Sequence, residues 1–361
     1  MTTTPLPAGA PGRLALRLRV GRVGRAGWLA VAGVVSLGVV LIAGIVLGSV
    51  DLAPTTTIAI LARRLLGVDL GITWAPTAEA IVMDLRLPRV LTAMVVGTGL
   101  AVAGATFQGL LRNPLADPYV LGTASGAALG AAIAVILPVR ALVLEFGLLH
   151  GLAFLGALGS VTLVYRLSRT SPLAPLTSLL LTGYAVGSLL SAGLALAMYM
   201  SGTGLRTIFS YLLGGFDGTS WMRLAVAAPL IVGGSLAILL RARALNGFLL
   251  GEEAAAHLGV DVKRERVILL ALASLVTAAG VAIAGLIGFV GLVVPHLVRL
   301  LVGPNARLVL PISALFGASL LAAADVVARM LGGVPVGVVT AVIGAPFFLA
   351  LLRRARTGYE L

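Results

Sequence analysis

Charged residues are scarce in this chain, and cysteine is absent from it. The 361 residues include 13 acids and 26 basic residues, and Lys263 is the single lysine. Without thiols, the chain has neither disulfides nor thiolate metal sites. Charged residues make up 11% of the sequence, whereas a soluble domain carries about 25%. The composition therefore excludes a large water-soluble catalytic domain.

The shortage of lysine and acids also excludes several kinds of active site. A phosphate-binding loop of the G-x-x-x-x-G-K-[ST] type needs a lysine, and Lys263 has no glycine beside it. The sequence contains no H-E-x-x-H motif and no paired carboxylates, and its three histidines (His150, His257 and His296) are scattered. We therefore expect no enzyme activity, no cofactor and no metal site in this chain alone.

Long apolar runs dominate what is present. Hydrophobic residues make up 59% of the chain, and the mean hydropathy is +1.10. An apolar run of 18 or more residues is long enough to cross the roughly 30 Å hydrocarbon core as a helix. The sequence predicts an all-α polytopic membrane protein with a tail at 1–27 and a transmembrane domain at 28–361. About ten spans are predicted, at 28–50, 89–111, 118–138, 141–165, 174–200, 222–241, 266–285, 286–302, 308–328 and 335–352.

The distribution of basic residues predicts the orientation. Residues 1–27 contain five arginines and no acid, and short cytoplasmic loops are rich in arginine and lysine. We therefore place the N-terminus in the cytoplasm, and ten spans return the C-terminus to the same side. About 18 of the 26 basic residues then lie on the cytoplasmic side. This topology accounts for the net charge of +13, so we expect membrane lipid and no nucleic acid as a partner.

Two short segments recur at about half the chain length. Residues 99–104 (G-L-A-V-A-G) resemble 280–285 (G-V-A-I-A-G), and 126–131 resemble 317–322. Halves of five spans each would insert in opposite orientations, as in many transporters. The sequence therefore predicts two inverted five-helix halves. Gly122, Gly126 and Gly130 are spaced by four, which predicts a helix face that a neighbour approaches closely.

Three polar intervals interrupt the apolar pattern, at 51–88, 201–221 and 242–265. The first contains a possible surface helix at 58–66. The third is the longest inner loop, and good helix formers lie in it between Gly251 and Gly259. This short helix has two interpretations, a docking element for a partner or a solvated connector.

An ion-coupled carrier is an alternative function. Such carriers keep ionisable groups inside the membrane, where these groups are costly and serve function. Asp325 and Glu145 are the acids that we place within spans, both near span ends. A coupling site would therefore be built on Asp325.

Four groups of motifs follow one another along the chain. They are residues 86–89 (R-L-P-R) with 104–108 and 113–118, residues 251–259, residues 288–296 and residues 335–347. In this order they resemble the permease subunits of ABC importers for iron–siderophore complexes, haem and cobalamin. Residues 206–216 resemble a further family segment, and their Gly-Gly-Phe ending is closer to the cobalamin type.

The resemblance implies an importer driven by ATP that works by alternating access. It implies a homodimer with two ATP-binding subunits on the cytoplasmic face, which hold ATP and Mg, and an extracytoplasmic solute-binding protein. The chain itself would bind no cofactor and would lie in the bacterial cytoplasmic (inner) membrane. Its expected cargo is an iron chelate, siderophore or haem, and cobalamin is the alternative.

The resemblance also assigns roles to residues. Arg86, Arg89 and Arg329 would receive acidic side chains of the binding protein. Thr177 and Ser178 would form the cytoplasmic gate, although capping of the helix start explains them equally well. The helix that couples the permease to the ATPase would comprise Gly251, Glu252, Glu253, Ala254, Ala255, Ala256, His257, Leu258 and Gly259.

Overall fold

The computed structural model describes residues 10–137, 147–169 and 175–357, and all its regular elements in these ranges are helices. Seven of them are long and apolar enough to cross a membrane, and three shorter apolar helices complete a set of ten. These ten match the ten predicted spans. They are α1 (Ala10–Val46), α4 (Leu87–Leu110), α5 (Thr123–Ile136), α6 (Gly147–Ser168), α7 (Pro175–Met200), α9 (Trp221–Leu240), α12 (Val262–Ala284), α13 (Val290–Val302), α14 (Ala306–Met330) and α15 (Val336–Thr357).

Two boundaries are informative. Helix α1 begins at Ala10, so part of the predicted tail continues the first span as a helix. The predicted division between the seventh and eighth spans is confirmed, because α12 ends at Ala284 and α13 begins at Val290. Gly285 and Phe289 both have positive φ, which breaks the helical path at each end of this connection. Glu145 lies outside the described residues.

The polar intervals contain shorter helices. Helix α2 confirms the surface helix predicted within 51–88, whereas α8 and α10 were not predicted, because their segments read as polar loops. The short elements are α2 (Pro54–Leu66), α3 (Pro76–Ala80), η1 (Ile81–Arg86), η2 (Gly202–Gly204), α8 (Leu205–Leu213), α10 (Ala242–Leu250) and α11 (Glu252–His257).

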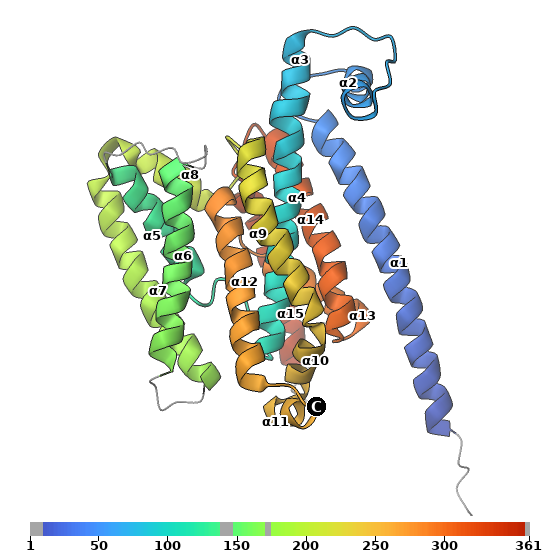
Figure 1. Ribbon diagram of the computed structural model, residues 1–361, viewed down its shortest axis with the longest axis vertical. Helices are drawn as coiled ribbons and strands as arrows, with labels where there is room; N and C mark the ends of the chain where they lie inside the picture. The colour runs from blue at the N-terminus through green and yellow to red at the C-terminus, as the bar shows by residue number, and fades with distance from the viewer. Residues whose placement is uncertain (1–9, 138–146, 170–174, 358–361) are drawn as a thin grey trace, which may run out of the picture.

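Helix α4 lies at the centre of the larger group of helices. It packs against α9, α12, α13 and α14, and its residues are buried along nearly the whole length. Helices α5, α6 and α7 form a second group, which α12 joins to the first (Figure 1). Helix α1 lies at the opposite edge, where it packs on α14.

The predicted glycine face is confirmed. A side chain at Gly126 or Gly130 would collide with backbone carbonyls of α6, those of Gly156 and Leu152 respectively. Gly122, directly before α5, faces Ser160 of α6. Helices α5 and α6 therefore approach each other more closely than any side chain larger than hydrogen permits.

The structure removes one argument for inverted halves. Residues 99–104 lie on the second span and 280–285 close the seventh, as five-helix halves require. Residues 126–131 lie on the third span but 317–322 on the ninth, and that pairing does not fit. The prediction of two inverted halves therefore rests on the resemblance of residues 99–104 to 280–285 alone.

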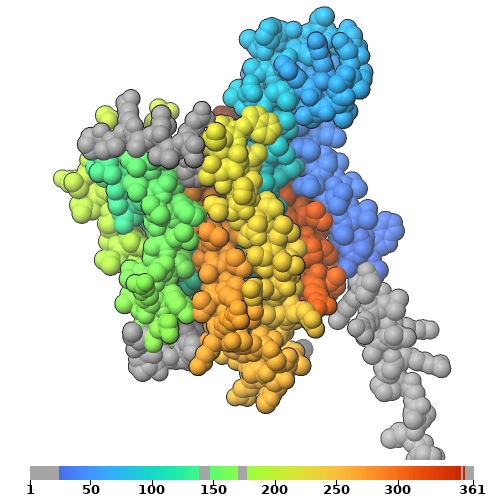
Figure 2. Space-filling model, viewed as in Figure 1, coloured from blue at the N-terminus to red at the C-terminus, as the bar shows by residue number. Residues whose placement is uncertain are grey.

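The bundle has two distinct ends. Helix α11, the start of α1 and the end of α15 lie at one end, and α2 and α3 lie at the other (Figure 1). Figure 2 shows α2 and α3 projecting beyond the remaining helices. We call the end with α2 and α3 the outer end and the end with α11 the inner end.

Candidate functional site

A π-helical turn positions the arginines at the outer end. The amide of Leu87 donates to the carbonyl of Val82 across this turn, five residues back. Pro88 follows directly, and a proline can neither donate to the carbonyl four residues back nor fit against it. A widened turn before Pro88 relieves this conflict. Arg86 ends the turn, and Arg89 lies in the first turn of α4.

Arg86 and Arg329 bind the C-terminal end of α1. The Nη1 of Arg86 donates to the carbonyls of Ile45 and Val46 at 2.9 and 2.7 Å, and its Nη2 donates to Val50. The guanidinium of Arg329 donates to the carbonyls of Gly44 and Leu47 at 3.0 and 2.9 Å. The last carbonyls of a helix lack partners within the helix, and cations are stabilised there. The two arginines therefore fasten α1 to α4 and α14.

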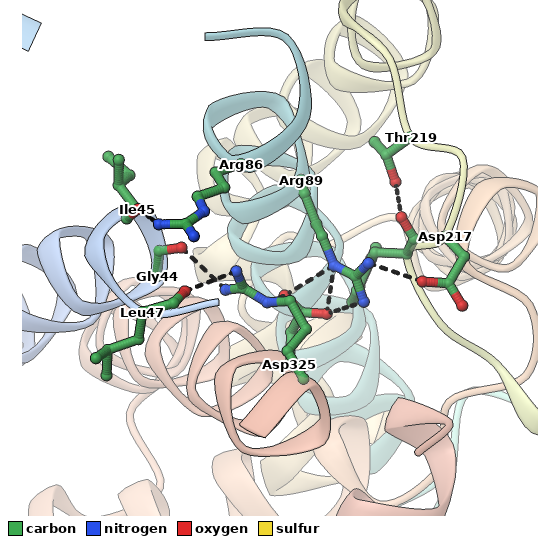
Figure 3. A network of polar contacts seen from close by, with 10 residues as sticks. Gly44, Ile45, Leu47, Arg86, Arg89, Asp217, Thr219 and Asp325 are labelled. Carbon is green, nitrogen blue, oxygen red and sulfur yellow. Dashed lines mark hydrogen bonds and ion pairs between the residues drawn. The ribbon is translucent and has the colours of Figure 1, made fainter. Parts of the chain in front are cut away.

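Asp325 joins the third arginine to this group. Its carboxylate is fully buried and lies between two guanidinium groups (Figure 3). Nε and Nη2 of Arg89 lie 2.9 and 2.8 Å from Oδ1, and Nε of Arg329 lies 3.1 Å from Oδ2. A buried charge is tolerated when it is paired in this way. We call Arg86, Arg89, Arg329 and Asp325 the outer cluster.

The pairing of Asp325 argues against the alternative function, an ion-coupled carrier with its coupling site on Asp325. A coupling carboxylate has to exchange its cation during transport. Asp325 instead pairs with the guanidinium groups of Arg89 and Arg329, and that of Arg329 also fastens α1. The structure therefore gives Asp325 a structural role, and the ion-coupled interpretation loses its candidate group.

The outer cluster borders a cavity of about 210 Å³. All three arginines line it, together with the end of α1 and the connection between α8 and α9. The resemblance has these three arginines receive acids of a binding protein, but two of them are buried. Arg86 and Arg329 are 5% and 8% exposed because their guanidinium groups bind the carbonyls of α1.

Sequence reasoning missed Asp217, which lies in the connection between α8 and α9. Its Oδ1 lies 2.7 Å from Nη1 of Arg89 (Figure 3). The one sequence feature that could have pointed to Asp217 is its position directly after residues 206–216, the segment that resembles the family. No periodicity connects Asp217 to Arg89, which lies 128 residues away.

At the inner end, α11 packs on α10, which packs on the helix bundle. Ala255 is fully buried, and its Cβ packs near Gly247 of α10. Helix α10 in turn packs on α4 and α14, and the side-chain amide of Asn246 accepts a hydrogen bond from the amide of Ala306 at 2.7 Å. Gly251, with φ 108°, separates α10 from α11.

The predicted coupling segment is therefore helical at its centre and exposed on one side. Glu253, Ala256, His257, Leu258 and Gly259 are exposed, whereas Glu252 forms an ion pair with Arg266 of α12. Gly259 also has a positive φ. An exposed face on a buried base is the geometry of a docking element. A loosely attached connector has no such base.

The two predicted gate residues differ in their surroundings. Ser178 is buried, and its hydroxyl donates to the carbonyl of Ser168 at the end of α6, at 2.9 Å. Its side chain therefore joins α6 to α7. Thr177 is exposed at the same end of α7. The gate role of Thr177 and Ser178 stays a prediction.

Comparison with known proteins decides the family. Residues 36–354 match the model of the FecCD transport family. The chain belongs to the FecCD transport family. It is 47% identical to the cobalamin import system permease protein BtuC of Halobacterium salinarum over 301 residues, which cover 83% of this chain and 79% of that protein. It is 43% identical to the hemin transport system permease protein HmuU of Yersinia pestis over 280 residues, 76% of this chain and 83% of that one.

A solved structure agrees with the family and the fold. A metal-chelate type ABC transporter in an inward-facing conformation superimposes with a TM-score of 0.78 at 31% identity. The match covers 91% of this chain and 99% of that one. The FecCD chain is thus the permease of an ABC importer for iron chelates, haem or cobalamin. It is a multi-pass membrane protein without a bound cofactor, and a separate subunit binds and hydrolyses ATP.

Proposed function

We propose that this permease imports a corrinoid of the cobalamin type, with an iron chelate, haem or siderophore, as the second candidate. This reverses the order expected from the sequence. The support is the 47% identity to a cobalamin permease and the Gly-Gly-Phe ending at 214–216, whose Phe216 lines the cavity at the outer end. The 43% identity to the Y. pestis hemin permease is the reason that haem remains a candidate cargo.

The outer cluster is the proposed docking site for the solute-binding protein. Three arginines lie around one cavity at the outer end, and their guanidinium forks match carboxylates. The carboxylates of Asp217 and Asp325 pair with Arg89 and Arg329 and offset part of this charge. Charged groups in this setting steer encounter and fix the register of a complex.

The proposed pathway runs between two copies of α7. This helix contacts α5 and α6 and leaves much of its surface exposed. Its exposed positions include the hydroxyl groups of Thr177, Tyr184, Ser188, Ser191 and Tyr199, which repeat at helical spacing. In a homodimer such faces would line a wettable passage, and Thr177 would lie at its inner constriction.

The inner end is proposed to face the cytoplasm, where two ATP-binding subunits would dock on α10 and α11. The support is the exposed face of α11 and the arginine-rich ends of α1 and α15 at the same end. In the bacterial inner membrane, both termini would then be cytoplasmic. ATP-driven movement of α11 would reach α4 and α14 through α10.

Uptake by the assembled transporter tests the cargo. The chain, its ATPase and its binding protein would be reconstituted in proteoliposomes and offered labelled cyanocobalamin, haemin and ferrichrome separately. We expect ATP-dependent accumulation of cyanocobalamin above the other two. Accumulation of haemin or ferrichrome without cyanocobalamin would contradict the corrinoid assignment and support the iron chelate.

A further inference from the structure

We propose that Asp217 is an internal competitor for the carboxylate that docks at the outer cluster, and that it sets how strongly this permease takes a partner's acidic side chain. The ligand of the site is the carboxylate of a glutamate or aspartate on a partner protein. The inference rests on the docking role proposed above. It concerns a residue to which neither the sequence motifs nor the family assign a function.

Arg89 is the most exposed arginine of the outer cluster. Arg89 is 19% exposed, more than Arg86 or Arg329, so an incoming acid reaches Arg89 first. The Nε and Nη2 of Arg89 are engaged by Asp325, and Nη1 remains as the outward donor group. That group already holds Asp217 at 2.7 Å (Figure 3). A partner carboxylate can take this position only when Asp217 leaves it.

The two acids on Arg89 differ in how easily they are displaced. Asp325 is fully buried on α14, so the loss of its cations would leave an unpaired buried charge. The side chain of Asp217 is 83% exposed, and water can solvate it once it is released. Exposed ion pairs contribute little, so displacement costs little. Asp325 is thus the fixed partner of Arg89, and Asp217 is the exchangeable one.

The segment that carries Asp217 also forms a wall of the docking cavity. Phe216, Gly218 and Thr219 line the cavity beside the three arginines. Gly214 and Gly218 have positive φ, so the segment turns sharply on both sides of Asp217. Asp217 and the buried Asp325 are the two carboxylates that pair with arginines of the outer cluster. Withdrawal of Asp217 therefore removes one negative charge from beside the arginines that a partner's carboxylate meets.

Chemical protection of Arg89 tests this proposal without the binding protein. The transporter, assembled with its ATPase in lipid nanodiscs, would be treated with phenylglyoxal, and modification of Arg89 would be followed by peptide mass spectrometry. Glutarate serves as the probe, because its carboxylate matches a glutamate side chain. We expect Asp217→Asn to lower the glutarate concentration for half-protection roughly two- to fivefold. The matched control is Asp84→Asn, an exposed acid at the same end in no ion pair among the described residues, and it should leave the value unchanged.

Several outcomes would overturn the proposal. Equal protection in wild type and Asp217→Asn would show that Asp217 does not compete for Arg89, and an equal shift in Asp84→Asn would reduce the effect to general charge. An unchanged melting temperature of Asp217→Asn would show that the variant folds. Docking of the binding protein to Arg89→Gln is measured separately. Undiminished docking there would overturn the docking role as well, whereas weakened docking with unchanged protection would overturn the competition alone.

Discussion

At the scale of residues, the outer cluster shows how a chain with few charges uses them. Arg329 contributes its guanidinium both to carbonyls of α1 and to the carboxylate of Asp325. The family resemblance implied one shared role for Arg86, Arg89 and Arg329. It could not indicate their partners, since backbone carbonyls at the end of α1 carry no sequence signal.

Replacement of Arg329 should destabilise the protein. Arg329→Ala leaves two α1 carbonyls unpaired and leaves Asp325 with one cation. Removal of one partner from a buried ion pair costs about 3 kcal/mol or more of unfolding free energy. Thermal unfolding in detergent should therefore show a melting temperature several degrees lower. Arg307→Ala, an exposed arginine on the same helix, is the control, and an equal loss in both variants would remove the structural role of Arg329.

At the scale of elements, α11 depends on a few backbone bonds. The amide of Ala255 donates to the carbonyl of Gly251 at 2.9 Å. Ala255→Pro removes this bond and places a ring against α10, a disruption that costs about 3 kcal/mol in a helix interior. We expect ATP hydrolysis that no longer drives uptake, measured side by side in proteoliposomes. Glu253→Ala keeps the helix and serves as the control, and normal coupled uptake by Ala255→Pro would make the segment a connector.

The contact between α5 and α6 makes an independent prediction. Gly126→Leu should separate the two helices, because the added side chain meets the backbone of Gly156. Overpacking of this kind costs about 1–3 kcal/mol. Gly159→Leu on α6 is the matched control, because a side chain there enters open space. A melting temperature that falls for Gly126→Leu alone supports the close contact, and equal values would contradict it.

The ten apolar helices could be predicted because a helix that crosses the membrane needs a long apolar run, and such runs are visible in the sequence. Helices α8 and α10 could not, since nine residues give too little periodicity to distinguish a short helix from a polar loop. The short helix between Gly251 and Gly259 was predicted because its glycines and helix formers are local features. The ion pair of Asp217 was not predictable, because it depends on the tertiary fold.

At the scale of the whole molecule, the two ends of the bundle have different chemistry. The outer end gathers arginines around a cavity, and the inner end presents a helix on a packed base. A continuous core around α4 joins them through α14 and α10. This arrangement suits a permease that receives cargo at one end and energy at the other.

The source of that energy is the central claim, and one measurement tests it most directly. Proteoliposomes that contain the chain with its ATPase and binding protein would be loaded with ATP and Mg, and cyanocobalamin, haemin and ferrichrome uptake would be followed with and without a protonophore. The account predicts uptake of one of these cargoes that requires ATP and survives collapse of the proton gradient. Uptake that stops with the protonophore while ATP is held constant would contradict it and would return attention to Asp325.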